Sequence, residues 1–340
     1  DKAGNETNCT SSQNVKIDLT KPSCTVSGGS TTWTSGSRTV TGKCSDTGGS
    51  GCKSDISYTY KGTADKNYSI TNAGPDGAGK GGKVYDKAGN SASCAANQTV
   101  KIDRKKPSCS VSGGSSTWTN SSRTVTGKCS DDGSGCKGNI SYTYNGTANQ
   151  NYSITNAGAA GAGKGGTVYD NVGNSASCAA NQTVKIDRKK PSCTVSGGSA
   201  TWTSGSRTVT GKCSDTGGSG CKGNISYTYN GIANQNYSIT NAGAAGAGNG
   251  GTVSDNAGNS ASCAANQTVK IDRKKPSCTV SGGSTTWTSG SRTVTGKCSD
   301  DGSGCKGNIS HTYNGTANQN YNITNAGAAG AGNGGTVSDN

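Results

Sequence analysis

The chain has 340 residues, of which 56 are Gly and 16 are Cys, only 28% are hydrophobic, and the formal net charge is +14. So few apolar side chains exclude a large conventional core, and no apolar run approaches the roughly 18–20 residues of a membrane-spanning helix. Cysteines that compensate for a thin core are typical of small secreted domains in an oxidising compartment, so we expect an extracellular protein without membrane insertion.

One sequence pattern recurs along the whole chain. A tryptophan returns after 85, 84 and 85 residues, and a cysteine and a proline keep the same intervals. A period of this length is too long for a helical solenoid unit and suits one small β-sandwich. The motif Asp-Lys-Ala-Gly-Asn opens the chain, which stops where the motif begins again, so we expect a window cut from a longer array.

The pattern divides the chain into five segments. We expect residues 1–19 (the N-terminal segment) to be the last strand of a split or preceding module. Residues 20–104, 105–188 and 189–273 (the first, second and third repeats) are expected to be complete immunoglobulin-like repeats. Residues 274–340 (the fourth repeat) are expected to lack their last strand.

Short runs rich in β-branched and aromatic residues alternate with Gly, Asn and Ser within each repeat, which favours strands over helices. In Ile140, Tyr142 and Tyr144, apolar residues alternate with polar ones, as in a strand with one buried face. In the second repeat we predict strands over Ser108–Ser112, Ser116–Thr119, Arg123–Cys129, Ile140–Tyr144, Asn151–Thr155, Thr167–Asp170 and Ser175–Asp187. Seven short strands predict an all-β fold, a tandem array of immunoglobulin-like or fibronectin type III-like β-sandwiches.

The end of each repeat resembles bacterial immunoglobulin-like repeats. Val168–Asn174 contains the D-x-x-G-N hairpin of that family, Thr183–Asp187 is similar to its closing strand, and Asp18–Pro22 closely matches its linker. The resemblance implies a large surface protein, adhesin or stalk. The four cysteines of each repeat distinguish this chain from the commoner cysteine-free versions.

The D-x-x-G-N motifs that begin at Asp86, Asp170 and Asp255 predict hairpin turns, because Asp and Asn bond their own backbone and Gly supplies a positive φ. A calcium ligand is the alternative role of these aspartates. The largest apolar side chains are expected to anchor the cores, unless they are exposed and bind sugar or a neighbouring subunit; they are Trp33, Trp118, Trp202 and Trp287. The other core residues expected in the first repeat are Val40, Ile56, Tyr58, Ile70, Val84, Val100 and Ile102.

Four cysteines in each repeat fall near one pole of the expected sandwich, and four cysteines allow three pairings. We favour a local loop staple together with a bond from the first strand to the last, and the runner-up joins Cys109 to Cys129 and Cys136 to Cys178. The favoured pairs are Cys24–Cys94, Cys44–Cys52, Cys109–Cys178, Cys129–Cys136, Cys193–Cys263, Cys213–Cys221 and Cys298–Cys305, with Cys9 and Cys278 as the pair of the split module. A zinc site is disfavoured, because the close pairs lack the C-x₂₋₄-C spacing of zinc knuckles.

Acidic side chains gather at the expected entry pole of each module. Asp103, Asp131 and Asp170 should lie close together there, and hard cations such as calcium take several oxygen ligands. The basic run 104–106 in the same junction opposes a divalent ion. We therefore expect salt bridges or solvation, with calcium at the module junctions as the alternative and no other metal or cofactor.

The remaining features bear on partners and chemistry. The basic charge suits contact with anionic cell-surface polymer or glycan, whereas nucleic-acid binding is not expected because no aromatic binding face is evident. The single His (His311) replaces a strand tyrosine of the other repeats, and the single Glu is Glu6. Since acid–base catalysis needs a positioned titratable group, we do not expect an enzyme.

These observations predict a structural extracellular repeat protein that forms a cell-surface stalk, fibre or filament. In one version the last repeat is completed by strand addition between head-to-tail copies of the chain. The alternative is a multivalent adhesin that binds glycan or host protein through module loops. Loops that barely differ between repeats favour the structural role.

Overall fold

The computed structural model describes residues 1–340 and is all-β, with no helix among its elements and with seven disulfide bonds. The chain forms two compact units, which are described separately. Unit 1 comprises Asp1–Ser115, Arg123–Tyr144 and Ile154–Val184, and unit 2 comprises Ser116–Ser122, Asn145–Ser153 and Lys185–Asn340.

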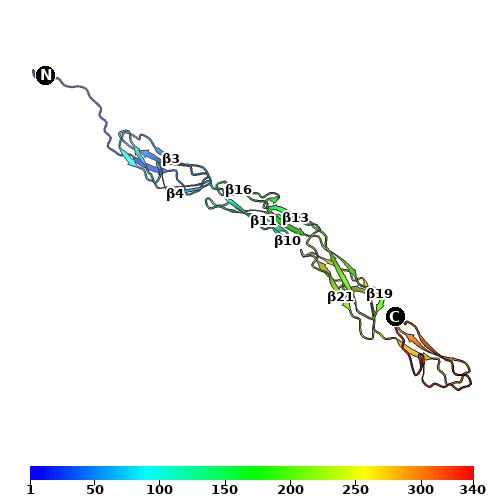
Figure 1. The fold of residues 1–340 in the computed structure, drawn as a ribbon. Helices are drawn as coiled ribbons and strands as arrows, with labels where there is room; N and C mark the ends of the chain where they lie inside the picture. The colour runs from blue at the N-terminus through cyan, green and yellow to red at the C-terminus, as the bar shows by residue number, and fades with distance from the viewer. The chain divides into compact units, whose positions relative to one another are not determined.

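The first repeat, in unit 1, contains two three-stranded sheets and one hairpin. The sheets have the strand orders β1-β2-β3 and β5-β4-β8, and β6 pairs with β7; β3 and β4 are labelled in Figure 1. The strands are β1 (Ser23–Ser27), β2 (Arg38–Ser45), β3 (Ile56–Tyr60), β4 (Asn67–Gly74), β5 (Gly77–Ala78), β6 (Lys83–Tyr85), β7 (Ser91–Ser93) and β8 (Gln98–Asp103).

The second repeat has the same elements and one further strand, β10. Its strands are β9 (Ser108–Ser112), β10 (Ser115–Thr119), β11 (Arg123–Ser130), β12 (Ile140–Tyr144), β13 (Asn151–Gly158), β14 (Gly161–Ala162), β15 (Thr167–Tyr169), β16 (Ser175–Ser177) and β17 (Gln182–Asp187). The bounds of β9 and β12 are those predicted. The predicted strand over Ser175–Asp187 is instead two strands, because Cys178 bonds Cys109 at the break and its N–H donates to the Gly166 carbonyl at 2.9 Å.

The third and fourth repeats lie in unit 2. The third repeat has sheets of order β18-β20-β21 and β19-β26-β22-β23 and the hairpin β24-β25. Its strands are β18 (Ser192–Ser196), β19 (Ser199–Thr203), β20 (Arg207–Ser214), β21 (Ile225–Tyr229), β22 (Asn236–Gly243), β23 (Gly246–Ala247), β24 (Thr252–Ser254), β25 (Ser260–Ser262) and β26 (Gln267–Asp272). The fourth repeat has β27 (Ser277–Ser281), β28 (Arg292–Ser299), β29 (Ile309–Tyr313), β30 (Ala326–Gly327) and β31 (Gly330–Ala331).

The core of a repeat consists of two small clusters. In the first repeat one cluster is aliphatic and aromatic, and it contains Val40, Tyr60, Ala73, Val100 and Ile102, all at most 3% exposed. The other surrounds the sulfur atoms and contains Cys44, Val84 and Cys94. The third repeat has both clusters as well. Alternating side chains of β2 face these clusters, as the period of two along a strand requires.

The tryptophans are not core anchors, so that prediction is wrong. Trp33, Trp118 and Trp202 are only partly buried, and Trp287 is 67% exposed. A lysine of the last strand lies over each of the first three rings, with Nζ 5.5 Å from the ring centroid. The ring therefore packs against a solvated amphipathic side chain on the outer side of the sheet, and smaller aliphatic residues fill the interior.

Tyr58 was also predicted in the core, and it is 46% exposed. Its neighbour along the same face, Tyr60, is buried instead. The Tyr60 hydroxyl donates to the Gly74 carbonyl at 2.9 Å and accepts the Gly74 N–H at 3.0 Å. A buried tyrosine needs such a partner for its hydroxyl, and only the position at the end of β3 supplies one. Ile56 and Ile70 are partly buried, and Val40, Val84, Val100 and Ile102 are fully buried.

The seven disulfides join the pairs that the sequence favoured: Cys24–Cys94, Cys44–Cys52, Cys109–Cys178, Cys129–Cys136, Cys193–Cys263, Cys213–Cys221 and Cys298–Cys305. Cys109 and Cys129 are directly opposite on β9 and β11, yet Cys109 bonds Cys178 and Cys129 bonds Cys136. The runner-up pairing is therefore not the one in the structure.

Cys9 and Cys278 do not form the predicted pair within the chain. Both are free and exposed. The pair fails because the N-terminal segment forms no strand, as the strandless start of the ribbon in Figure 1 illustrates. Cys9 therefore lacks the sheet that positions its counterpart Cys94 against Cys24.

The two disulfides of a repeat should differ in their contribution to stability. In the chain-entropy model, replacing both cysteines of Cys193–Cys263, 70 residues apart, by alanine should cost about 4 kcal/mol. The same change at Cys213–Cys221, 8 residues apart, should cost about 2.5 kcal/mol. Hydrogen exchange of the β20 and β26 amides in each variant measures the difference. Equal losses would contradict the larger contribution expected of the long bond.

Candidate functional site

The D-x-x-G-N motif forms a closed turn around its aspartate. Asp170 Oδ1 accepts the N–H groups of Val172, Gly173 and Asn174 at 3.1, 2.7 and 2.7 Å. Its Oδ2 accepts Asn174 Nδ2 at 2.6 Å, and Gly173 has a φ of 100°. The carboxylate is 0% exposed, and its hydrogen bonds compensate for its burial. The turn is the one that the sequence predicts.

The turn also holds the linker from the preceding repeat. Asn174 Nδ2 lies 3.1 Å from the carbonyl of Asp103 and 3.2 Å from that of Lys105. The Asp103 carboxylate, 0% exposed, accepts the N–H of Lys105 at 3.1 Å and that of Ser134 at 2.7 Å. One polar network therefore joins the end of β8, the linker and the loop after β11.

Asp131 completes a cluster of three carboxylates. Its Oδ2 accepts the N–H groups of Gly133 and Gly135 at 3.2 and 2.8 Å. Its Oδ1 is buried and has no hydrogen-bond partner. One oxygen each from Asp103, Asp131 and Asp170 all lie within 4.8 Å of one another. The structure thus brings together the three aspartates that the sequence placed near the entry pole.

An asparagine oxygen, which the sequence analysis missed, lies at the same place. Asn67 Oδ1 is buried without a partner. A Cβ atom on Gly133 would lie 2.5 Å from Asp103 Oδ2 and 2.7 Å from Asn67 Oδ1, so both oxygens border the space that this glycine leaves open. Asn67 is the cross-strand partner of Asp103 in the register of β4 and β8. The signal was the recurrence of Asn at the start of this strand in each repeat.

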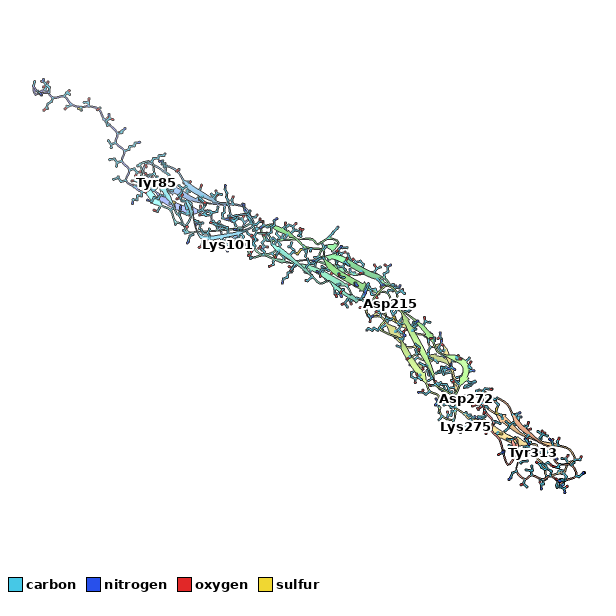
Figure 2. The ribbon with its side chains drawn as sticks, viewed as in Figure 1. Tyr85, Lys101, Asp215, Asp272, Lys275 and Tyr313 are labelled. Atoms are coloured by element: carbon cyan, nitrogen blue, oxygen red, sulfur yellow. A yellow bond between two sulfur atoms is a disulfide. The ribbon has the colours of Figure 1, made fainter.

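The cluster recurs at other junctions. Asp18, Asp46 and Asp86 form one in unit 1, and Asp187, Asp215 and Asp255 form one in unit 2, with the same close approach. The oxygens without a partner recur as well: Asp46 Oδ1, Asp215 Oδ1, Asp300 Oδ1, Asn151 Oδ1 and Asn236 Oδ1 are buried and unbonded. Figure 2 labels Asp215 and also Asp272, which lies at the last junction, where its Oδ2 accepts the Ser303 N–H at 2.7 Å.

Nearby lysine charge is directed outside the cluster. Lys105 Nζ lies 2.8 Å from Asp132 Oδ2, and both side chains are about half exposed. Their hydrogen bond lowers the pKa of Asp132 and raises that of Lys105. Lys274 and Asp301 repeat the pair at 2.7 Å. At the junction of the third repeat Thr216 stands in place of this aspartate, and Lys189 Nζ donates to the Thr216 carbonyl at 3.3 Å.

These contacts leave negative charge concentrated in a small space. Two unit charges about 4.8 Å apart repel by roughly 3 kcal/mol at an effective dielectric constant of about 20. Carboxylate and amide oxygens without donors are the ligands that a hard divalent cation takes, and calcium accepts six to eight of them. The cluster can therefore hold such a cation, with Asp103, Asp131, Asp170 and Asn67 as ligands.

His311 lies at the position of the exposed strand tyrosines. Its ring stacks edge-on against Tyr313, with centroids 4.8 Å apart, as Tyr58 stacks on Tyr60. It also covers the hairpin at Gly330, as Tyr58 covers Gly77. His311 thus fills the same structural place as the tyrosine that it replaces.

The structure contains no helix that is long and apolar enough to cross a membrane. Comparison with known protein families finds none that matches the chain, and comparison with curated proteins finds no similar sequence.

Proposed function

We propose that the chain is a structural repeat protein of the cell exterior, built from immunoglobulin-like modules of about 85 residues, which forms part of a stalk, fibre or filament. The observation that carries this proposal is that each disulfide bonds two cysteines of one repeat. Each repeat therefore staples itself, as small secreted domains with thin cores do. Such bonds persist in an oxidising environment.

Two further features support the module type and the array. The sheets β1-β2-β3 and β5-β4-β8 contribute Val40, Tyr60, Val100 and Ile102 to one shared cluster, as the two layers of a sandwich would. The network that links one repeat to the next is built from equivalent residues at successive junctions. Repeated junctions of one kind suit a protein that carries load or spans distance, because stability is then close to a sum over modules and junctions.

Calcium at the junctions would add to this role. The support is the set of buried carboxylate and amide oxygens that have no donor, together with three carboxylates within 4.8 Å. A cation there would connect the last strand of one repeat, the loop after β11 and the D-x-x-G-N turn, and would so stiffen the junction. Anionic cell-surface polymer remains a candidate partner for the basic linkers.

Calcium binding should depend on Asp131 and not on an exposed aspartate outside the cluster. Titration calorimetry should detect calcium binding by the intact chain. The Asp131→Asn variant should bind one calcium ion fewer, because it removes the negative charge of a carboxylate whose Oδ1 has no hydrogen-bond donor. The matched control, Asp76→Asn, removes the same charge from an exposed turn outside the cluster and should bind the full number. Calcium at 100 times its Kd should stabilise the affected repeats by about 2.7 kcal/mol. Absence of binding by the unaltered chain would contradict the proposal.

The structural role predicts resistance to proteases that depends on the disulfides. In the oxidised chain, trypsin should cleave only the strandless N-terminal segment, at Lys2 or Lys16. After reduction and alkylation of the cysteines it should cut throughout the repeats, because the sulfur cluster no longer holds each core together. Gel electrophoresis of timed digests provides the measurement. Rapid digestion of the oxidised chain would refute the structural role.

One observation favours the adhesin as a second candidate. In unit 2 a shallow cavity of about 520 Å³ is lined by polar residues, namely Asn120, Ser121, Ser122, Asn149, Arg188 and Asn259, with Ala148. Amide, hydroxyl and guanidinium groups of this kind suit a glycan. A glycan array with the oxidised chain should show binding that Arg188→Ala reduces at least tenfold if the cavity is a binding site. Silence across the array would count against the adhesin and leave the structural role.

A further inference from the structure

The linker arginine Arg188 has a hydrogen-bond donor that the chain does not use. Its Nε–H is buried and has no acceptor, and its Nη2 lies 3.3 Å from the hydroxyl oxygen of Ser122. The two ion pairs of the chain do not include Arg188. A guanidinium stays charged at every ordinary pH, and a buried donor without an acceptor costs free energy. An acceptor that comes from outside the chain would therefore be stabilised here.

Arg188 borders a cavity that can admit such an acceptor. It lines the shallow cavity of about 520 Å³ in unit 2 (the junction cavity). The other lining residues are Asn120, Ser121, Ser122, Ala148, Asn149 and Asn259. Amides and hydroxyls thus surround a single cation, and no carboxylate lines the wall. The volume lies in the range of roughly 300–1,000 Å³ that is usual for small-molecule sites.

Positive charge at this junction is not paired with nearby acids. Both oxygens of Asp187, the residue before Arg188, accept backbone N–H groups, at 3.0 and 2.7 Å. Lys189 Nζ donates to the carbonyl and hydroxyl of Thr216 and has no carboxylate partner. Its counterparts in the linkers before the second and fourth repeats each pair with an aspartate. The charge that this junction lacks is therefore that of an anion.

The equivalent place in unit 1 is closed by the chain itself. There Arg104 Nε donates to the Ser35 carbonyl at 3.1 Å, and Ser35 Oγ donates to the Val172 carbonyl at 3.2 Å. The sequence position of Asn149 is occupied by Asp65 in the first repeat, which adds a negative charge. Two features that favour an anion in unit 2, the donor without an acceptor and the neutral amide, are thus both missing in unit 1.

The sequence of one loop differs where the unused donor lies. The second repeat has Asn120-Ser121-Ser122 where the other repeats have Ser-Gly-Ser, at residues 35–37, 204–206 and 289–291. Asn120 lies beside the turn of the third repeat, because a Cβ on Gly258 would be 3.2 Å from Asn120 Nδ2. Arg188 is also the only linker arginine whose Nε is buried without a partner. The changed loop and the unused donor therefore belong to the same cavity.

We propose that the junction cavity binds a carboxylated sugar, such as a uronate residue of an acidic polysaccharide. The planar fork of the Arg188 guanidinium matches a carboxylate, and Nε and an Nη group can donate to its two oxygens. The amides and hydroxyls of Asn120, Ser121 and Asn149 can both donate and accept, as the hydroxyls of a sugar require. An inorganic anion would use only the donors. This inference rests on the adhesin candidate and names its ligand class.

A pair of matched ligands tests the recognition of the carboxylate. Titration calorimetry of the oxidised full chain with the trimer of galacturonate should show one trimer bound per chain, because only the second repeat has the changed loop. The fully methyl-esterified trimer keeps the sugar rings and loses the charges. It should bind at least tenfold more weakly, since hydrogen bonds to a charged group are the stronger ones.

A pair of matched variants separates the cavity from diffuse attraction to a chain of net charge +14. Arg188→Gln should weaken binding of the trimer at least tenfold, because it removes the donors that meet the carboxylate. Arg104→Gln removes the same charge from the linker of unit 1, where Nε already has an acceptor. It should leave the affinity within twofold.

A change of the loop tests the cavity while Arg188 is kept. The double variant Asn120→Ser with Ser121→Gly gives the second repeat the loop sequence of the other three repeats. It should bind the trimer at least tenfold more weakly, because the amide and the hydroxyl that meet the sugar are removed. Resistance of the oxidised variant to trypsin shows that its repeats are folded.

Four results would overturn the inference: no binding of the trimer, equal affinity for the methyl ester, equal affinity for inorganic sulfate, or equal losses in Arg188→Gln and Arg104→Gln. If the ester binds as well as the acid, the ligand class is wrong and the adhesin candidate stands. If the trimer does not bind and a glycan array is also silent, the adhesin candidate fails with the inference. The structural role stands in each case as long as the oxidised chain resists trypsin.

Discussion

The disulfide cluster of the first three repeats is the interaction on which the rest of the structure depends. In the first repeat Cys44, Cys94 and Val84 are the buried members of that cluster, and Val84 alone is an aliphatic side chain. Without the two bonds this half of the core would depend on Val84 and on the partly buried Val26, Ile56 and Ala92. The hydrophobic contribution scales with buried apolar surface, so it would be small. The bonds also shorten the loops that an unfolded chain can explore. Oxidation thus does for this half of the repeat what aliphatic packing does for the other half.

The sulfur cluster also explains part of the glycine content. Gly127 lies inside β11, where glycine is ordinarily unfavourable. A Cβ there would lie 2.9 Å from Cys178 Sγ and 3.0 Å from Ile140 Cγ1. Gly211 has the equivalent neighbours, and a Cβ on Gly42 would lie 2.9 Å from Cys94 Sγ and 3.0 Å from Pro75 Cγ. A side chain at this position would displace the disulfide. Glycine in this strand therefore has an entropic cost, but only glycine leaves room for the disulfide between the first strand and the residue that follows the hairpin.

Sequence reasoning identified the features that depend on local pattern. Strands such as β9 and β12, the D-x-x-G-N turn and the approach of Asp103 to Asp131 and Asp170 follow from spacing and residue type. It was wrong about Trp118, because size and hydrophobicity do not reveal which face of a strand points outward. The contact of Lys185 with the Trp118 ring stabilises the ring on the outer face, and that lysine comes from a different strand. It also missed Asn67, whose role depends on its cross-strand register with Asp103.

The last strand is where these features meet. In the first repeat β8 supplies Val100 and Ile102 to the core, Lys101 to Trp33, and Asp103 to the carboxylate cluster of the next junction. Cys94, four residues before it, makes the long disulfide. A single ten-residue segment therefore closes the core of one repeat and begins the attachment to the next. In the third repeat the equivalent strand, β26, lies between β19 and β22 and pairs with both. Folding of a repeat and its connection to the following repeat therefore depend on the same segment.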